Sequence, residues 1–595
     1  MTHELERYAA IGDMETLALV SDEGGIDWLC WPRFDSPSLF GRLLDDDGGH
    51  WTIQPDDEMT ARRQVYLSQT NVLMTRIHTD TGVLEVEDCM AVDGDRRGLM
   101  REVTCRRGSV DVRMVMEVRP DYGRGTADIS ASNAGATIDV GTDAPLELTS
   151  DVDVTVDDGR VTARFHLAEG DTVRFALGDH VFDDIPSAVA TTLAFWRSWS
   201  EQSTYHGRYH EIVGRSALAL KLLTHAPSGG LIAAGTTSLP EVLGGERNWD
   251  YRYVWIRDAA FTLYALIELG YRDEATAFVG WLTDRLAETA AHCHDDADAP
   301  PLSPLYDLDG NSDLDETELD HWRGYADSSP VRIGNAASGQ MQLDIYGELI
   351  DSLYLADKQT DGLSIDAWNH IRTIVDWLTD HWERPDDGMW EARSGPQRYT
   401  SSLLMCWVAV ERAMRMAHHR GRPADLDRWR RARDEMHDTL MHRGVNDGVF
   451  TQVLDGTALD ASMLLAPLVK VISPTDPLWL STLDAIGDRL AHGPLVDRYD
   501  LADSDDGLDG DEGSFTICSF WYVEALAMSG RGREAQLLFD RLLSYATPTG
   551  LFSEEIGPNG RLLGNFPQAF THLALISAAV RLDEVLDTPG PPTSR

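Results

Sequence analysis

Lysine is almost absent from this 595-residue chain, in which the only lysines are Lys221, Lys358 and Lys470. Basic side chains number 51 against 99 acidic ones, so the formal net charge is −48. Such a chain repels polyanions, which argues against nucleic acid and acidic membrane surfaces as partners. The sequence also lacks a Gly-Lys dipeptide, a G-x-S-x-G elbow and an H-E-x-x-H motif. P-loop nucleotide, serine-esterase and zincin chemistry therefore have no motif support.

Cysteine is scarce and scattered, and no C-x-x-C pair occurs, which favours reduced or buried thiols over a disulfide framework or a zinc site. The N-terminus lacks a basic region followed by an apolar one, and no apolar run is long enough to span a bilayer. We therefore expect a cytoplasmic protein. The six cysteines are Cys30, Cys89, Cys105, Cys293, Cys406 and Cys518.

Acidic residues are spread along the whole chain, as in the runs at 45–47 and 503–506. One interpretation is simply an acidic soluble protein. The sharper one is a protein of high-salt surroundings, where salt screens self-repulsion and a carboxylate-rich surface maintains solubility. We favour the halophilic interpretation.

The residues up to about 190 form short runs of alternating apolar and polar residues, separated by turn residues. Examples are the runs 110–118, 161–167 and 172–177, with turns expected at 157–159 and 169–171. This pattern predicts an antiparallel β-sandwich over residues 1–190.

From about residue 210 the apolar period becomes helical. Paired helices can form an open solenoid or close into a toroid of six hairpins, (α/α)6, and the aromatic-rich loops favour the toroid. We expect a linker helix at 191–212, a catalytic toroid at 213–588 and a disordered tail at 589–595. The expected helices are Glu211–Thr224, Val254–Leu269, Asp273–Thr289, Ala336–Ala356, Ala367–Trp382, Ser402–Ala417, Leu426–Met441, Ala461–Val471, Leu478–Leu490, Thr516–Met528, Glu534–Ser544 and Ala569–Leu582.

The segment 247–258, RNWDYRYVWIRD, mixes four aromatic side chains with five charged ones. Aromatic rings stack on the apolar faces of sugars, and adjacent Arg257 and Asp258 offer the hydrogen-bond donors and acceptors that a hydroxyl-rich ring needs. The alternative is a core aromatic cluster with a salt bridge at a helix start. We favour a sugar pocket, since so many buried charges require partners.

Two further segments carry carboxylates between apolar residues. In Gly388–Arg393, Glu391 follows Trp390, and an apolar neighbour favours the neutral form that a general acid needs. In Gly550–Gly557, Glu554 and Glu555 are adjacent, so that one can point into a site while the other forms a structural ion pair. A lone glutamate on a loop is more often merely solvated.

Three other segments are weaker candidates. Arg332 and Asn335 lie in a loop before an expected helix, and Arg498 precedes an acidic loop; such residues often only cap backbone carbonyls. The segment 307–318 has the ligand spacing of an EF-hand loop, but Ser312 replaces the glycine of the sharp turn. We expect no metal and no cofactor.

Together these motifs resemble glycoside hydrolase family 15, which holds glucoamylases, glucodextranases and prokaryotic trehalases. The acid-rich composition of the chain is of the haloarchaeal type. The resemblance to the family rests on the motifs at 247–258, Gly388–Arg393 and Arg332–Asn335 and on two later segments. Those segments are GSFTICSFW at 513–521 and SEEI at 553–556 with GNFPQ at 564–568. The stretches 11–20, 26–32 and 34–37 are similar to the β domain of prokaryotic members.

The resemblance implies an inverting exo-α-glucosidase of glucoamylase type that acts on malto-oligosaccharides and releases β-glucose. It makes Glu391 the general acid and Glu554 the general base, with roughly 6.5–9.5 Å between the carboxyl groups to admit a water. It also implies that the glucose pocket is formed by Tyr251, Trp255, Arg257, Asp258 and Trp390, with Arg332, Asn335 and Arg498 as further contacts. Ala392 stands where some glucoamylases carry a second glutamate.

Three alternatives remain. An α,α-trehalase shares all of these motifs. An inverting glucoside phosphorylase shares the architecture but needs a phosphate pocket in place of Glu554. A non-catalytic helical scaffold would show regular repeats, which the sequence lacks. The expected partner is an α-glucoside substrate in each enzymatic case.

Overall fold

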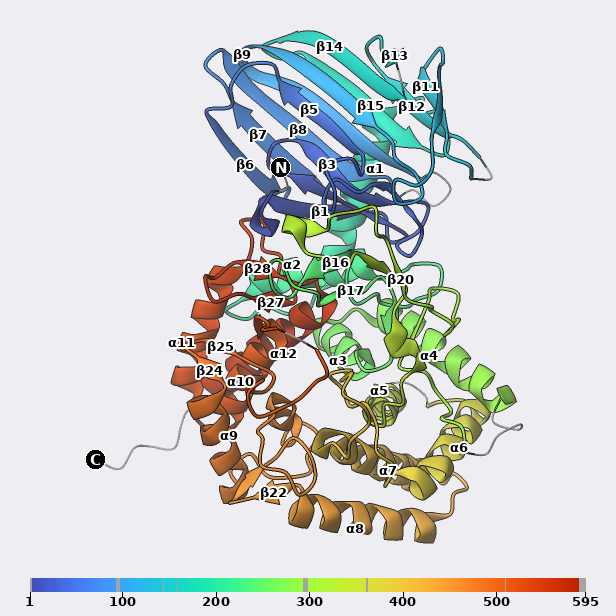
Figure 1. The fold of residues 1–595 in the computed structure, drawn as a ribbon, viewed down its shortest axis with the longest axis vertical. Helices are drawn as coiled ribbons and strands as arrows, with labels where there is room; N and C mark the ends of the chain where they lie inside the picture. Colours follow the sequence, from blue (N-terminus) through green and yellow to red (C-terminus); the bar gives the residue numbers. More distant parts are fainter. Residues whose placement is uncertain are drawn as a thin grey trace.

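The structure, a computed structural model, describes residues 3–92, 97–142, 144–157, 159–292, 298–359, 362–508 and 510–587. An N-terminal β domain lies against a helical domain, and helix α1 (Ile185–Ser200) connects them (Figure 1). This arrangement confirms the predicted fold class. Cys293 and the predicted tail at 589–595 lie outside the described residues, and the other five cysteines are buried free thiols.

The long strand β9 joins the two sheets of the β domain. Its first half pairs with β8 and β15, and its second half pairs with β5 and β14. The change of sheet occurs at Gly108, whose φ is +72° and where a Cβ would lie 2.2 Å from the carbonyl oxygen of Thr81. Only glycine fits this bend without strain. Apolar side chains such as Val20, Ile53, Leu84 and Val103 fill the space between the sheets.

All strand pairs of this domain are antiparallel, as the alternating pattern predicts. One sheet contains β1 (Tyr8–Gly12), β2 (Leu17–Ser21), β3 (Gly25–Cys30), β4 (Ser38–Phe40), β5 (His50–Pro55), β13 (Thr155–Asp157) and β14 (Arg160–Ala168). The other contains β6 (Ala61–Tyr66), β7 (Leu73–His78), β8 (Gly82–Met90), β10 (Asp128–Ala131), β11 (Gly135–Asp139), β12 (Leu146–Ser150) and β15 (Thr172–Gly178), and β9 (Gly98–Glu117) belongs to both.

The helical domain is a closed ring of inner segments surrounded by outer helices (Figure 1). Each inner segment contacts the next, and the last contacts the first. The inner segments are α3 (Ala259–Leu269), α5 (Asp344–Gln359), α7 (Thr400–Arg420), the 3₁₀ segment η4 (Ala461–Leu465), α10 (Thr516–Met528) and α12 (Ala569–Asp587). The outer helices are α2 (His210–Leu223), α4 (Arg272–His292), α6 (Ile365–His381), α8 (Leu426–Arg443), α9 (Pro477–Arg489) and α11 (Gly532–Leu542).

Burial distinguishes the two layers. Outer helix α6 buries one stripe that includes Trp368, Ile371, Val375 and Leu378, and the side chain of Ser364 caps its first turn. Inner helix α10 is buried on every side from Thr516 to Ala527. Helix α10 accordingly has an almost wholly apolar sequence, which the helical period alone does not predict.

Four of the predicted helices differ clearly from the observed segments. The linker helix expected at 191–212 is observed as α1, which begins at Ile185 and ends at Ser200, and residues 201–209 are not helical. Residues 254–255 pair with 305–306 as a short sheet, so helix α3 begins only at Ala259. The helix expected from 336 starts at Asp344, because the backbone N–H groups of Met341 and Leu343 bond the side chains of Asp387 and Asp386 instead. The helix expected at 461–471 is the short η4 followed by turns; Pro467 lacks the N–H that a continuing helix requires.

The loops at one end of the helical ring contain short strands of two to four residues. They are β16 (Thr237–Pro240), β17 (Asn248–Asp250), β18 (Val254–Trp255), β19 (Leu305–Tyr306), β20 (Thr317–Glu318), β21 (Arg332–Ile333), β22 (Val445–Asn446), β23 (Val449–Phe450), β24 (Ala491–His492), β25 (Leu495–Val496), β26 (Ser514–Phe515), β27 (Glu555–Ile556) and β28 (Leu562–Leu563). No helix within the described ranges is both long and apolar enough to cross a membrane.

Candidate active site

Residues 248–255 form the short strands β17 and β18 with a bend at Tyr253 between them, and cavity-lining side chains of this segment are interspersed with buried ones. Trp249, Tyr251, Trp255 and Arg257 line cavities. The intervening Arg252 is buried and points toward the β domain.

Arg252 joins this segment to the β domain. Its guanidinium donates hydrogen bonds to the Tyr122 hydroxyl at 2.9 Å, to the Ser36 carbonyl at 2.9 Å and to Asp250 Oδ2 at 2.6 Å. Burial of an arginine is tolerated only when its charge and its N–H groups are matched in this way. The β domain therefore fixes the position of the strand that carries the cavity-lining residues.

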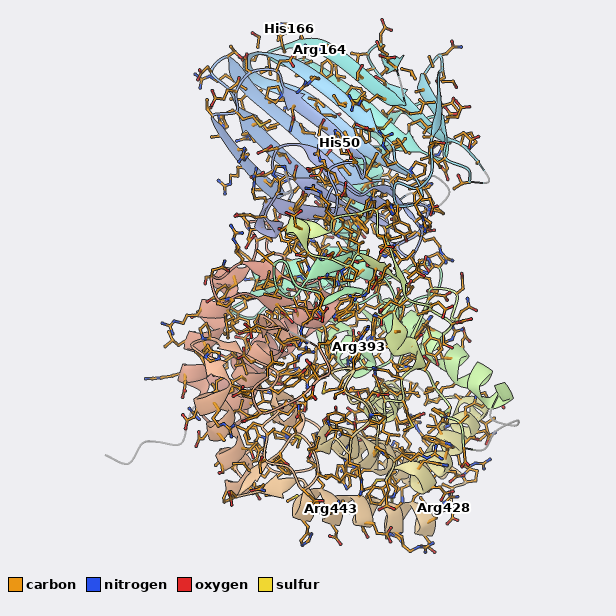
Figure 2. The ribbon with its side chains drawn as sticks, viewed as in Figure 1. His50, Arg164, His166, Arg393, Arg428 and Arg443 are labelled. Carbon is orange, nitrogen blue, oxygen red and sulfur yellow. The ribbon has the colours of Figure 1, made fainter. Side chains whose placement is uncertain are left out.

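Two adjoining cavities share Tyr251, Trp390, Glu391 and Arg498. The narrow cavity, of about 40 Å³, is also lined by Trp255, Arg257, Asp258, Phe515, Glu554 and Phe570. The wider cavity, of about 300 Å³, is also lined by Glu241, Trp249, Asn335, Ala392, Arg393 and Asp506. Arg393 lies near the middle of the helical domain in the view of Figure 2.

Glu391 lies on a loop that begins at Asp386, and its φ of +60° is unusual for a residue other than glycine. Its Oε1 accepts hydrogen bonds from Trp255 Nε1 at 2.7 Å and from the Arg257 guanidinium at 3.1 Å. Arg257 also bonds the carbonyl of Met389. Oε2 makes no hydrogen bond to the described residues, so one carboxylate oxygen is fixed and the other is available to a ligand.

Glu554 precedes strand β27 and is buried. It accepts hydrogen bonds from the Tyr251 hydroxyl and, at 3.4 Å, from the backbone N–H of Asn565. Burial and the nearby carboxylate of Glu241 raise the pKa of Glu554 above its ordinary value. Tyr251 stays neutral because burial and the charge of Glu554 raise its own pKa.

Glu555 is buried but lines neither cavity. Its Oε2 accepts a hydrogen bond from the Gly513 backbone N–H at 2.8 Å, between β26 and β27. Its Oε1 has no hydrogen-bond partner among the described residues, and burial together with Glu241, the acid that also lies near Glu554, raises the pKa of Glu555.

Asp258 is buried at the start of helix α3, and its Oδ1 has no hydrogen-bond partner among the described residues. Burial raises its pKa to about 6, and the charge of Arg257 opposes this rise. A buried acceptor without a partner is costly unless a ligand satisfies it. The position suits a sugar hydroxyl.

The other predicted contacts fall into two groups. Trp390 and Arg498 line both cavities; Trp390 Nε1 bonds Asp460 at 3.0 Å, and Arg498 bonds Glu512 at 2.9 Å. Asn335 lines the wider cavity and bonds the Asp250 carbonyl at 3.1 Å.

Arg332 lines neither cavity. Its guanidinium lies 4.7 Å from the ring centre of Trp249 and bonds the carbonyl oxygens of Glu246 and Asn248, so it supports the cavity wall from behind. Arg393 lies 4.1 Å from the same ring. Two guanidinium groups thus hold the Trp249 indole against the wider cavity.

Glu241 is the residue that the sequence does not reveal. It is buried, and its Oε1 accepts a hydrogen bond from Trp249 Nε1 at 2.9 Å. Its Oε2 has no hydrogen-bond partner among the described residues but lies 3.8 Å from the guanidinium of Arg498. Burial raises its pKa, while the charge of Arg498 opposes this rise. It follows β16 in the plain sequence Ser-Leu-Pro-Glu, and no motif separates it from a surface glutamate.

The loop at 307–318 forms a turn closed by its own side chains. Asp307 accepts hydrogen bonds from the backbone N–H groups of Asp309 and Asn311. Asp309 pairs with Arg33 of the β domain at 2.8 Å. In the part of the chain that the structure describes, no group of three or more His, Cys, Asp or Glu side chains is arranged to hold a metal.

Comparisons with known proteins agree with this arrangement. Residues 207–580 match the family described as "Glycosyl hydrolases family 15", and residues 1–177 match "Trehalase-like, N-terminal". A "Trehalase" of Mycobacterium tuberculosis is 40% identical, covering 98% of this chain and 90% of its own. A "Trehalase" of Thermoplasma volcanium is 33% identical, with coverage of 98% and 94%.

Among solved structures, a bacterial glucoamylase complexed with acarbose matches with a TM-score of 0.73, covering 99% of this chain and 95% of its own. Its sequence identity is 12%, so the likeness concerns the fold.

Proposed function

The chain belongs to glycosyl hydrolase family 15, and from this premise we propose that it is an α,α-trehalase that hydrolyses its substrate with inversion. The observation that carries the proposal is the set of relatives named trehalase, which are 33–40% identical over nearly the whole chain. The β domain matches a trehalase-like domain, in agreement with them.

The sequence alone favours a glucoamylase acting on malto-oligosaccharides, and the comparisons favour the trehalase alternative instead. The glucoamylase structure resembles this chain at only 12% identity, which supports a shared fold and no particular substrate. The motifs that the sequence offers bind one glucose in either enzyme, so they do not separate the two substrates.

In the proposed reaction one glucose of trehalose occupies the narrow cavity. Arg257 and Asp258 hold its hydroxyl groups, and the Trp255 ring forms part of the wall. The second glucose lies in the wider cavity, beside Trp249 and Ala392. Ala392 has no side-chain polar group there, so recognition of the second glucose depends on Trp249 and its neighbours.

Glu391 acts as the general acid and protonates the oxygen between the two sugars. Because Trp255 and Arg257 occupy Oε1, Oε2 is the oxygen that carries the transferred proton. Glu554 acts as the general base and deprotonates the attacking water, while the Tyr251 hydroxyl holds its carboxylate in place. Glu554 is competent only when ionised.

A phosphorylase is less well supported, because the buried Glu554 lines the position where a phosphate would have to bind. A scaffold without catalysis leaves the buried carboxylates of the cavity without a role.

The test is glucose release by the purified full chain from trehalose and, in parallel, from maltotriose, in phosphate-free buffer. The proposal predicts release from trehalose at a kcat/KM at least tenfold above that for maltotriose. Faster release from maltotriose would support the glucoamylase, and release that requires phosphate would support the phosphorylase; either result contradicts the proposal.

A further inference from the structure

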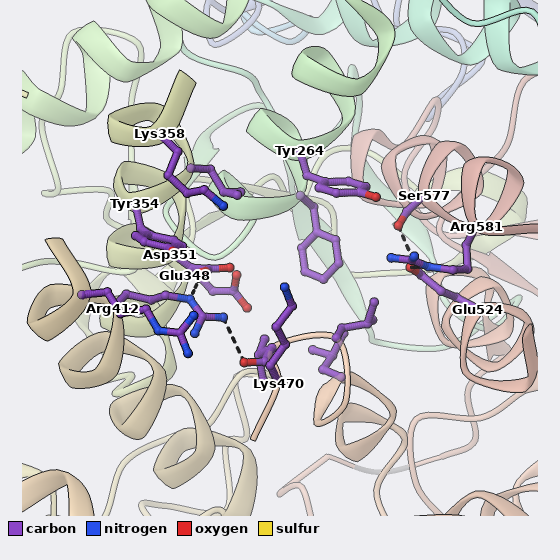
Figure 3. A pocket seen from close by; sticks show the side chains of 16 residues that line it. Tyr264, Glu348, Asp351, Tyr354, Lys358, Arg412, Lys470, Glu524, Ser577 and Arg581 are labelled. Atoms are coloured by element: carbon purple, nitrogen blue, oxygen red, sulfur yellow. Dashed lines mark hydrogen bonds and ion pairs between the residues drawn. The ribbon is translucent and has the colours of Figure 1, made fainter. Parts of the chain in front are cut away.

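A third cavity, which we call the basal cavity, lies away from the loops that carry the candidate active site. It has a volume of about 270 Å³, and it shares no lining residue with the two cavities described above. Its lining comes from the inner segments α3, α5, α7, α10 and α12 and from the turns after η4 (Figure 3).

The position follows from the direction of the inner helices. Helices α3, α10 and α12 begin at the catalytic end, where Asp258, Phe515 and Phe570 line the narrow cavity. The basal residues come later on the same helices; Arg581 follows Phe570 by eleven positions on α12, a rise of about 16 Å. The charged residues of the basal cavity therefore lie toward the other end of the ring, whereas Phe261 lies between the two sites, with its ring centre 5.3 Å from that of Phe570.

The charge of the lining is the reverse of that of the whole chain. Five cationic side chains line the basal cavity, against the three carboxylates Glu348, Asp351 and Glu524, whereas the chain as a whole has 51 basic and 99 acidic residues. The cations include two of the three lysines of the protein. They are Lys358, Arg412, Arg415, Lys470 and Arg581.

The three arginines of this set form ion pairs with carboxylates of the protein. Arg412 bonds Asp351 at 2.5 Å and Glu411 at 2.8 Å, and Arg581 lies 3.6 Å from Glu524. Arg415 is bound by Glu411. These pairs account for two of the three lining carboxylates.

The two lysines are not occupied in this way. Neither Lys358 nor Lys470 forms an ion pair with any residue that the structure describes, and they extend from opposite walls toward the middle of the cavity (Figure 3). Burial, together with Asp351 and Asp344, raises the pKa of the remaining carboxyl, Glu348, well above its ordinary value. Glu348 also forms no ion pair with either lysine among the residues that the structure describes.

The backbone of Lys470 supports a role for its side chain. Its φ is +66°, in the left-handed region that lysine rarely adopts. The turn after η4 holds this conformation and turns the side chain into the cavity. Strained residues concentrate at functional sites.

The rest of the wall is apolar. Phe261, Leu355, Leu465 and Leu468 line the cavity, together with the rings of Tyr264 and Tyr354. A simple inorganic ion would leave these side chains without contacts, whereas a hydrocarbon or aromatic group would cover them.

We propose that the basal cavity binds a small organic anion, with its charged group between Lys358 and Lys470 and its apolar body against Phe261 and Leu468. The charged group is an oxyanion such as a carboxylate or a phosphate monoester, which accepts hydrogen bonds from both ammonium groups. This inference is independent of the proposed trehalase activity.

The experiment is isothermal titration calorimetry of the full chain with phenyl phosphate, phenol and inorganic phosphate. The KCl concentration is the lowest at which the protein stays folded, and saturating glucose occupies the catalytic site. Phenyl phosphate is expected to bind at least tenfold more tightly than either fragment, because only it satisfies both halves of the cavity.

Variants locate the bound probe. Lys358→Gln and Lys470→Gln are each expected to weaken phenyl phosphate binding about tenfold or more. Lys470→Arg retains the charge and is expected to restore most of the affinity. Arg443→Gln removes a surface cation on α8, away from the cavity, and is expected to leave binding unchanged (Figure 2).

Circular dichroism establishes that each variant is folded. Binding of phenyl phosphate no tighter than that of phenol would overturn the proposal. Equal affinity in the wild type, Lys358→Gln and Lys470→Gln would overturn it as well, since the probe would then bind elsewhere.

Discussion

At the scale of single residues, the two proposed catalytic carboxylates are held in different ways. Glu391 has one oxygen fixed by Trp255 and Arg257 and one without a protein partner. Glu554 is buried behind Tyr251 and is flanked by a further acid, Glu241. The free oxygen of Glu391 can give a proton outward, whereas burial and Glu241 raise the pKa of Glu554 to about 8, so that the proposed base is fully ionised only above that pH.

Glu391→Gln and Glu554→Gln are each expected to lower kcat for trehalose about 10²-fold to 10⁴-fold, because each removes one proton-transfer group. The amide is nearly isosteric, so folding should be retained. Initial rates of glucose release and near-ultraviolet circular dichroism measure the two effects. Full activity in either variant would remove that residue from the mechanism.

Glu241→Gln is expected to shift the acidic limb of the pH profile. The charge of Glu241 raises the pKa of Glu554, and the base works only when ionised. Removing that charge lowers the pKa, so kcat/KM for trehalose should reach its plateau at a pH lower by roughly one unit.

Exposed Glu383 provides a matched control, since it lies on the surface with its side chain 70% exposed and Glu383→Gln should leave the profile unchanged. An unchanged acidic limb in Glu241→Gln would show that this acid does not control the base.

The sequence predicts the residues whose chemistry is visible in a local pattern. Tyr251, Arg257 and Asp258 belong to one dense motif, and Glu391 follows a tryptophan. Glu241 was not predictable, because its burial depends on contacts with Trp249 and Arg498, and Arg498 is more than 250 positions away. The support that Arg332 gives to Trp249 also depends on tertiary packing.

At the scale of elements, the extended segment that follows β16 links the two domains. Arg252 is buried against the β domain and Asp250 is its buried ion-pair partner, whereas Trp249, Tyr251, Trp255 and Arg257 line the cavities. The β domain therefore helps to position the candidate active site, although its own strands do not line either cavity.

Arg252→Ala is expected to destabilise the protein by about 3–5 kcal/mol, because it leaves the carboxylate of Asp250 buried without its partner. Trehalose hydrolysis should fall as well, since Tyr251 lies next to the lost anchor. Chemical denaturation monitored by fluorescence gives the free energy of unfolding.

Arg164 of the β domain is the matched control, with its side chain 69% exposed and paired with Asp56 (Figure 2). Arg164→Ala should change the free energy of unfolding by less than about 0.5 kcal/mol. Equal effects of the two substitutions would contradict the role of Arg252.

Helix prediction succeeds where a helix buries apolar residues on one face only. It fails where the residues at a predicted helix start belong to a loop instead. Outer helix α6 was predictable within two residues at its start and one at its end, since its apolar residues recur on one face. The predicted starts at 254 and 336 were wrong because strand pairing and bonds to acidic side chains replace helical hydrogen bonds there. Such partners are distant in sequence.

At the scale of the whole molecule, the net charge of −48 dominates behaviour in dilute buffer. The Debye length falls from about 30 Å at 0.01 M salt to about 3 Å at 1 M, so repulsion between distant carboxylates is screened only at high salt. The melting temperature is therefore expected to rise by more than about 5 °C between 0.05 M and 2 M KCl, as measured by circular dichroism. A melting temperature independent of KCl would contradict the halophilic interpretation.

The central claim is that two carboxylates at the loop end of the ring hydrolyse an α-glucoside by inversion. Proton NMR of the first products from trehalose tests it most directly. Inversion at one anomeric carbon converts that glucose to the β form, while the leaving glucose stays α, so the account predicts equal initial amounts of the two anomers. Initial α-glucose alone would contradict it.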